Sequence, residues 1–70
     1  MNNDRDKEYD DYQMLTTKEL AKLTGLGRDK AYALMNSHGF PAIKIGKSFR
    51  VTFKAYKIWA DNNIGRTINI

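Results

Sequence analysis

The sequence contains no cysteine, one histidine and one proline among 70 residues. Without cysteine the chain forms no disulfide and offers no thiolate to zinc. His38 alone does not assemble a metal site, because such sites need several ligands. We therefore expect neither a bound metal nor a cofactor.

Long apolar runs are also missing. No stretch approaches the roughly 18 residues that a membrane span needs, and no apolar signal-peptide core is present, so we expect a cytoplasmic chain without membrane contact. A chain of 70 residues holds one small core and no deep substrate cavity. Ser37 and His38 are neighbours without an orienting carboxylate. We expect neither an enzyme nor a small-molecule substrate.

Charge is distributed unevenly along the chain. Residues 1–12 carry five acidic and two basic side chains, a net charge of −3. Since the whole chain has a formal charge of +4, the other 58 residues carry +7. A basic body of this kind is typical of nucleic-acid binders. The alternatives are a solvated basic surface and a protein-protein adaptor with an acidic partner.

The chain divides into three parts. Residues 1–13 are predicted to form an acidic disordered tail, because they are polar and lack apolar periodicity. Residues 14–63 form the folded domain, and residues 64–70 a C-terminal tail. Ile68 and Ile70 alternate with polar residues in this tail, which is compatible with a frayed end, an edge strand or a docking segment.

The segment LTTKEL contains the clearest helix start. Thr16 and Glu19 have the spacing of a capping box, and Leu15 and Leu20 that of a hydrophobic staple, so a helix is predicted to begin at Thr17. Leu20 and Leu23 are predicted to share its apolar face. The Gly-containing segment 24–27 ends this helix and buries one leucine.

A second helix is predicted from Arg28 to about Ser37, with Ala31, Leu34 and Met35 in the core. Two helices joined by a short glycine-containing turn are typical of a helix-turn-helix. The opposite face of the second helix presents side chains that suit phosphates and base edges. These candidate DNA-binding residues are Arg28, Asp29, Lys30, Tyr32, Ala33 and Asn36.

The segment AIKIGKSFRVT alternates apolar and polar residues around a glycine, which predicts a β-hairpin. A three-residue loop, 46–48, would pair Ile43 with Val51 and Ile45 with Phe49 on one buried face. This register places Lys44 and Arg50 opposite each other, where a DNA backbone would relieve their repulsion. Solvated cations are the alternative. The candidate contacts in the hairpin are Lys44, Lys47, Ser48 and Arg50.

A third helix is predicted after Thr52, a suitable N-cap, and ends by Asn63 or Gly65. Its apolar face contains Phe53, Tyr56, Trp59 and Ala60, while Lys54, Lys57 and Asp61 point outward. Trp59 is predicted to pack in the core rather than to stack on a base.

Residues 15–59 resemble the excisionase and MerR-like DNA-binding module. That module has a capped first helix, a Gly-aliphatic turn, an Arg-led second helix, Pro-Ala and a basic hairpin with Ile-Gly. The matching residues are Thr17, Glu19, Gly25, Leu26, Arg28, Tyr32, Leu34, Ser37, Pro41, Ala42, Ile45, Gly46, Lys47, Arg50 and Trp59. The resemblance implies an α+β winged helix-turn-helix, with three helices and a two-stranded wing between the second and third.

The resemblance also implies how DNA would be bound. The second helix would enter the major groove, and the wing would meet the adjacent minor groove or its phosphates. Arg28, Tyr32, Lys47 and Arg50 match positions near DNA in the family. Departures from the pattern are Gly27 at the cap, Ala33 in place of a basic residue, Ser48 at the wing tip, and the basic residues Lys54 and Lys57 in the last helix. Lys54 is accordingly a further candidate phosphate contact.

These observations predict a sequence-specific binder of double-stranded DNA. The small size and the resemblance favour an excisionase-like recombination directionality factor of a mobile element, which binds and bends attachment-site DNA. Its partners would be DNA, an integrase and further copies of itself on the same DNA. A small transcriptional regulator with the same module is the alternative.

Overall fold

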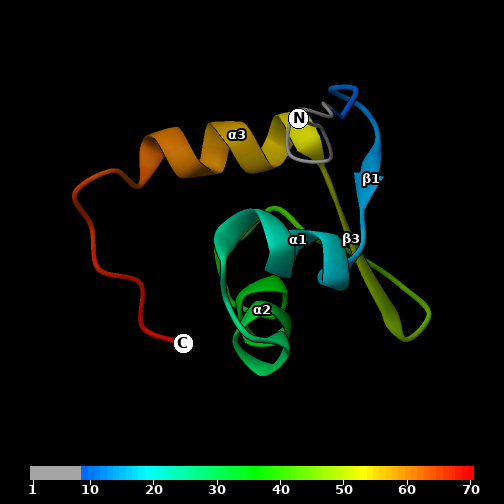
Figure 1. The fold of residues 1–70 in the computed structure, drawn as a ribbon, viewed down its shortest axis with the longest axis horizontal. Helices are drawn as coiled ribbons and strands as arrows, with labels where there is room; N and C mark the ends of the chain where they lie inside the picture. Colours follow the sequence, from blue (N-terminus) through cyan, green and yellow to red (C-terminus); the bar gives the residue numbers. More distant parts are fainter. Residues whose placement is uncertain (1–8) are drawn as a thin grey trace, which may run out of the picture.

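A computed structural model of the chain describes residues 9–70 (Figure 1). Its elements in chain order are β1 (Met14–Leu15), α1 (Thr17–Thr24), α2 (Arg28–Met35), β2 (Ile43–Ile45), β3 (Ser48–Thr52) and α3 (Phe53–Asn62). The α+β class and the three helices are confirmed. The sheet has a third strand that the sequence did not predict, because β1 pairs with β3 in the antiparallel order β1-β3-β2. Within residues 9–70, no helix is long and apolar enough to cross a membrane.

The predicted capping box starts α1. The Thr16 hydroxyl accepts a hydrogen bond from the Glu19 amide at 3.1 Å, and the Glu19 carboxylate accepts one from the Thr16 amide at 2.9 Å. Leu15 and Leu20 on either side are fully buried, as the staple predicted. At the other end, Gly25 takes the left-handed conformation that terminates a helix, with φ of 75°.

Thr16→Ala is expected to lower the free energy of unfolding by about 1 kcal/mol, because it leaves a helix amide without its partner. Urea unfolding followed by circular dichroism measures the change. Thr17→Ala is the matched control, since this neighbouring threonine lies inside α1. The control should stay within about 0.5 kcal/mol of the wild type. Equal losses in both variants would contradict the capping role.

Helix α2 ends two residues earlier than predicted. The Asn36 amide still donates to the Tyr32 carbonyl at 3.0 Å, but the Ser37 amide donates to Leu34 at 3.1 Å. The Ser37 hydroxyl donates to the same carbonyl at 2.7 Å. A tighter turn with a side-chain bond therefore replaces the last helical residues.

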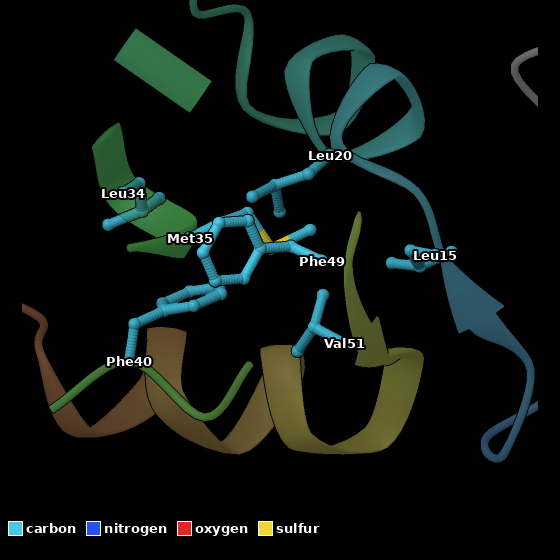
Figure 2. Packing of buried hydrophobic residues seen from close by; sticks show 7 residues of the cluster. All are labelled: Leu15, Leu20, Leu34, Met35, Phe40, Phe49 and Val51. Atoms are coloured by element: carbon cyan, nitrogen blue, oxygen red, sulfur yellow. The ribbon is translucent and has the colours of Figure 1, made fainter. Parts of the chain in front are cut away.

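The core lies between α1, α2 and the sheet (Figure 2). Its buried cluster consists of Leu15, Leu20, Leu34, Met35, Phe40, Phe49 and Val51. The prediction that Leu23 shares the buried face of Leu20 is wrong, because Leu23 is 39% exposed. The two side chains point about 60° apart around a helix, and the half-buried residues Ala21 and Thr24 lie on the other side of Leu20 from Leu23. Leu26, the leucine of the turn, packs partly buried against the cluster.

The predicted hairpin register is also wrong. Ile43 pairs with Arg50, Lys44 with Phe49 and Ile45 with Ser48, so the loop has two residues rather than three. Gly46 has a φ of 62°, which suits a two-residue loop. The prediction assumed that β2 had to bury its isoleucines, whereas β3 alone supplies the core with Phe49 and Val51. Lys44 and Arg50 therefore lie on opposite faces of the sheet.

Helix α3 packs against the core from outside. The Thr52 hydroxyl accepts a hydrogen bond from the Ala55 amide at 3.1 Å, which confirms the predicted N-cap. Trp59 meets Phe40 edge to face with ring centroids 4.8 Å apart. Trp59 therefore packs on the core as predicted, although it remains partly exposed. The helix ends at Asn62, and residues 64–70 form no helix or strand.

Residues 9–13, which the sequence assigned to the disordered tail, instead lie along the start of α3; residues 1–8 are outside the described part. The Gln13 and Asp11 carbonyls accept hydrogen bonds from the amides of Phe53 and Lys54 at 3.0 and 2.8 Å. The Asp11 carboxylate forms an ion pair with Lys57 at 2.8 Å, and this bond lowers the pKa of Asp11. This segment therefore caps α3 with its carbonyls.

Candidate nucleic-acid interface

A groove of about 740 Å³ separates the helix pair from the hairpin. The start of α1, the first turns of α2 and one side of the hairpin form its walls. The residues that line it are Thr16, Thr17, Lys18, Ala21, Arg28, Asp29, Tyr32, Lys47, Ser48, Phe49 and Arg50. Segments that are distant in the sequence thus meet at one concave surface.

The groove brings together six of the residues predicted to bind DNA: Arg28, Asp29, Tyr32, Lys47, Ser48 and Arg50. The remaining candidates do not line it. Lys30 is exposed and Ala33 half-buried on α2, and Asn36 is exposed at the C-cap of this helix. Lys44 is the middle residue of β2 in the hairpin, and Lys54 lies on α3. The candidate surface is therefore the groove together with the exposed side chains of α2 that line it, Arg28, Asp29 and Tyr32.

The electrostatics of the groove are positive. Four cations line it, Lys18, Arg28, Lys47 and Arg50, against the single carboxylate of Asp29. Asp29 lies in the first turn of α2, where the N-cap Gly27 provides no side-chain hydrogen bond. A carboxylate at this position interacts favourably with the helix dipole and stabilises the helix, so Asp29 has a local structural role as well. The net charge of the lining side chains favours a polyanion.

An aromatic contact connects α2 to the hairpin. The Tyr32 ring meets Phe49 edge to face with centroids 5.4 Å apart, and Tyr32 itself is 49% exposed. The Lys44 ammonium lies 5.6 Å from the centroid of the same Phe49 ring. Phe49 is buried, so it sets the spacing between helix and hairpin while Tyr32 and Lys44 keep polar atoms in solvent.

Arg50 is held near the backbone of its own strand. One guanidinium nitrogen, Nη1, donates to the Phe49 carbonyl at 2.9 Å. Since a guanidinium has five N–H donors, the others stay available for phosphate oxygens. Arg50 is therefore a fixed rather than a freely rotating cation.

Lys54 lies apart from the groove. Its ammonium is 3.3 Å from the Tyr12 hydroxyl and 5.4 Å from the centre of the Tyr12 ring. Figure 1 shows that α3 starts at one end of β3, while the hairpin loop lies at the other end. A duplex in the groove would reach Lys54 only by extending along the whole strand.

Lys18 is the functional candidate that the sequence analysis did not identify. It is exposed in the first turn of α1 and lines the groove opposite the hairpin. The sequence feature that could have identified Lys18 is its position in the first turn of α1, next to the capping box. A helix-turn-helix brings the start of its first helix close to the second helix. Thr16 and Thr17 enter the groove for the same reason.

Two short helices joined by a glycine-containing turn, with a hairpin beside the second, are compatible with a winged helix-turn-helix. Residues 14–62 match the family described as "Helix-turn-helix domain". The match covers more than half of the chain, and the protein belongs to this family.

Two proteins of Mycobacterium tuberculosis are similar to the chain. They are "Putative DNA-binding protein MT0521" of strain CDC 1551 / Oshkosh and "Putative DNA-binding protein Rv0500A" of strain ATCC 25618 / H37Rv. Each is 40% identical over 43 residues, which cover 61% of this chain and 55% of the relative. The chain thus spans about half the length of these curated relatives. No solved structure matches it significantly.

Proposed function

We propose that this chain binds double-stranded DNA, with α2 in the major groove and the hairpin against the flanking backbone. The observation that carries the proposal is the groove in which cations from α1, α2 and the hairpin converge beside an exposed helix face. Membership in the helix-turn-helix family and the names of the two mycobacterial relatives agree with it.

Helix α2 has suitable dimensions for this role. An α-helix with its side chains is about 10–12 Å across, which fits the roughly 12 Å width of the major groove, and the eight residues of α2 extend over about 12 Å along it. Arg28 at its start can donate two hydrogen bonds to a guanine edge, and Tyr32 and Asn36 follow on exposed turns. The phosphates of the DNA backbone would be bound by the cations on the walls of the protein groove, Lys18, Lys47 and Arg50. These contacts would fix the orientation of α2 on the duplex.

Salt dependence tests the proposal. With about four or five phosphates neutralised, raising salt from roughly 50 to 200 mM should weaken binding roughly a hundredfold. Fluorescence anisotropy with a labelled duplex, selected by the chain from a random pool, measures this. The salt slope is the slope of the logarithm of the binding constant against the logarithm of the salt concentration. Lys47→Ala and Arg50→Ala should each lower the magnitude of this slope by about one. Lys54→Ala is the control outside the groove and should leave the slope unchanged.

Failure to select any duplex would overturn the proposal and favour the adaptor with an acidic protein partner. A reduced slope in Lys54→Ala would instead extend the interface to α3.

We further propose an excisionase-like role, in which the chain binds and bends attachment-site DNA together with an integrase. One groove and one short helix give few base contacts, so high specificity would require several copies on neighbouring sites. Bending costs a few kcal/mol, which adjacent copies and a recombinase would offset.

The excisionase-like role has its own test. A circular-permutation assay on the attachment site of the mobile element measures bending, and an excision assay with and without integrase measures the recombination effect. The expected results are a bent complex and stimulated excision. Tight binding of one copy to unbent promoter DNA, with no effect on excision, would favour a transcriptional regulator.

A further inference from the structure

Strand β2 leaves two large aliphatic side chains uncovered. Ile43 is 46% exposed and Ile45 is 54% exposed, although the strand has only three residues. The observed register pairs them with Arg50 and Ser48. In β3, Ser48 and Arg50 alternate with Phe49 and Val51, which are buried in the core. Ser48 and Arg50 and their partners on β2 therefore point to the sheet face opposite the core.

Ile45 has the more unusual position of the two. It is the last residue of β2, directly before the loop of Gly46 and Lys47, and its cross-strand partner is the small Ser48. Ser48 and Lys47 both line the groove. A branched aliphatic side chain therefore stands at the end of the hairpin, beside the surface proposed to hold DNA.

The charges around Ile45 indicate what would cover it. Lys47 directly follows Gly46 in the loop, and Arg50, the cross-strand partner of Ile43, lies two pairs further from the loop on the same sheet face. Cations next to an apolar tip complement a narrow cleft whose two rims are phosphates. The minor groove of DNA is such a cleft, about 6 Å wide, and its base edges and stacked faces can bury an aliphatic group.

We propose that Ile45 is an apolar wedge that enters the minor groove next to the α2 site and opens one base step. This inference rests on the proposed DNA binding and adds a mechanism for bending. Lys47 and Arg50 would hold the phosphates on the two sides, while Ile45 replaces part of the base stacking. Side chains used in this way kink a duplex by roughly 20 to 90°.

Ile43 provides a matched control. It is the same residue type on the same face of the same strand, with similar exposure. It lies two residues, about 6.6 Å, farther from the loop. A general need for an apolar sheet face would involve both isoleucines, whereas a wedge at the tip needs only Ile45.

The test uses the full chain and a duplex that it selects from a random pool. 2-Aminopurine is placed in turn at each step of the minor groove that flanks the footprint. Wild-type chain and Ile43→Ala should raise the fluorescence at one step, while Ile45→Ala should not. Ile45→Ala should also bind roughly tenfold more weakly. Both substitutions are at exposed positions, and circular dichroism verifies that each variant is folded.

A mismatch at the responding step gives a second readout. It lowers the cost of unstacking, so the wild type and Ile43→Ala should bind the mismatched duplex several-fold more tightly than the intact one. Ile45→Ala should show no such gain. Tight binding without any fluorescence response, or equal responses in Ile45→Ala and Ile43→Ala, would overturn the wedge and leave the proposed DNA binding intact. A chain that selects no duplex would overturn both.

Discussion

Leu20→Ala is expected to lower the free energy of unfolding by about 2–5 kcal/mol. Leu20 is fully buried in the cluster between α1, α2 and the sheet, and it also forms one half of the staple with Leu15. Its truncation leaves a cavity in the core. To close it, α1 or α2 would have to shift, and both helices form walls of the groove. Because a domain of this size has only a few kcal/mol of stability, most of the variant should be unfolded at 37 °C. Circular dichroism during urea and thermal unfolding measures the loss.

Leu23→Ala is the matched control for this prediction. It removes the same side chain from the same helix at a position that is 39% exposed. Its expected effect is below about 1 kcal/mol, since little apolar surface leaves the core. Similar unfolding curves for the two variants would contradict the assignment of Leu20 to the core.

Arg28→Ala is expected to reduce DNA affinity by about 1–3 kcal/mol and to relax the preference at one base position. Arg28 is exposed at the start of α2 and lines the groove, so its guanidinium can reach a guanine edge. Titration of the variant against the selected duplex and its single-base substitutions measures both quantities. An equal loss on every sequence would make Arg28 a phosphate contact instead.

Lys30→Ala is the control for the charge of Arg28. Lys30 lies two residues further along α2 and does not line the groove. The Lys30→Ala variant should lose about 0.5 kcal/mol or less of DNA-binding free energy, because the charge of Lys30 acts on the DNA only at a distance through solvent. A loss as large as that of Arg28 would extend the interface to this side of α2.

The helices were predictable because their signals are local. The Thr16 and Glu19 spacing located the start of α1, and Thr52 located the start of α3, each from residues within one helical turn. The core positions of α2 also followed from the helical period alone. These patterns depend on backbone geometry and need no knowledge of distant contacts.

Two of the errors depend on contacts between distant segments. The hairpin register depended on which strand faces the core, and only the pairing of β1 with β3 shows that β3 is central. Residues 9–13 looked disordered because their composition is polar, yet the carbonyls of Gln13 and Asp11 accept hydrogen bonds from amides of α3 that lie 40 and 43 residues further along the chain. Composition does not reveal such backbone bonds, since every residue carries the same carbonyl group.

The candidate site was predicted in part. Residues on α2 and the hairpin were identified from their charge and from the family resemblance, and six of them line the groove. Lys18 was missed because its role depends on the packing of α1 against α2. Lys54 was assigned because it is a basic departure from the family pattern in the last helix, and its contact with Tyr12 was not foreseeable from the sequence.

Thr52 is at once the last residue of β3 and the N-cap of α3, and it also pairs with Met14 of β1. No linker therefore separates the hairpin from the third helix. Extra residues at the Gly46 loop would lengthen the hairpin and leave its base in place. One residue inserted after Thr52 would rotate α3 by about 100° and turn Trp59 away from Phe40. Length variation in this domain should consequently occur at the loop and be absent from the junction.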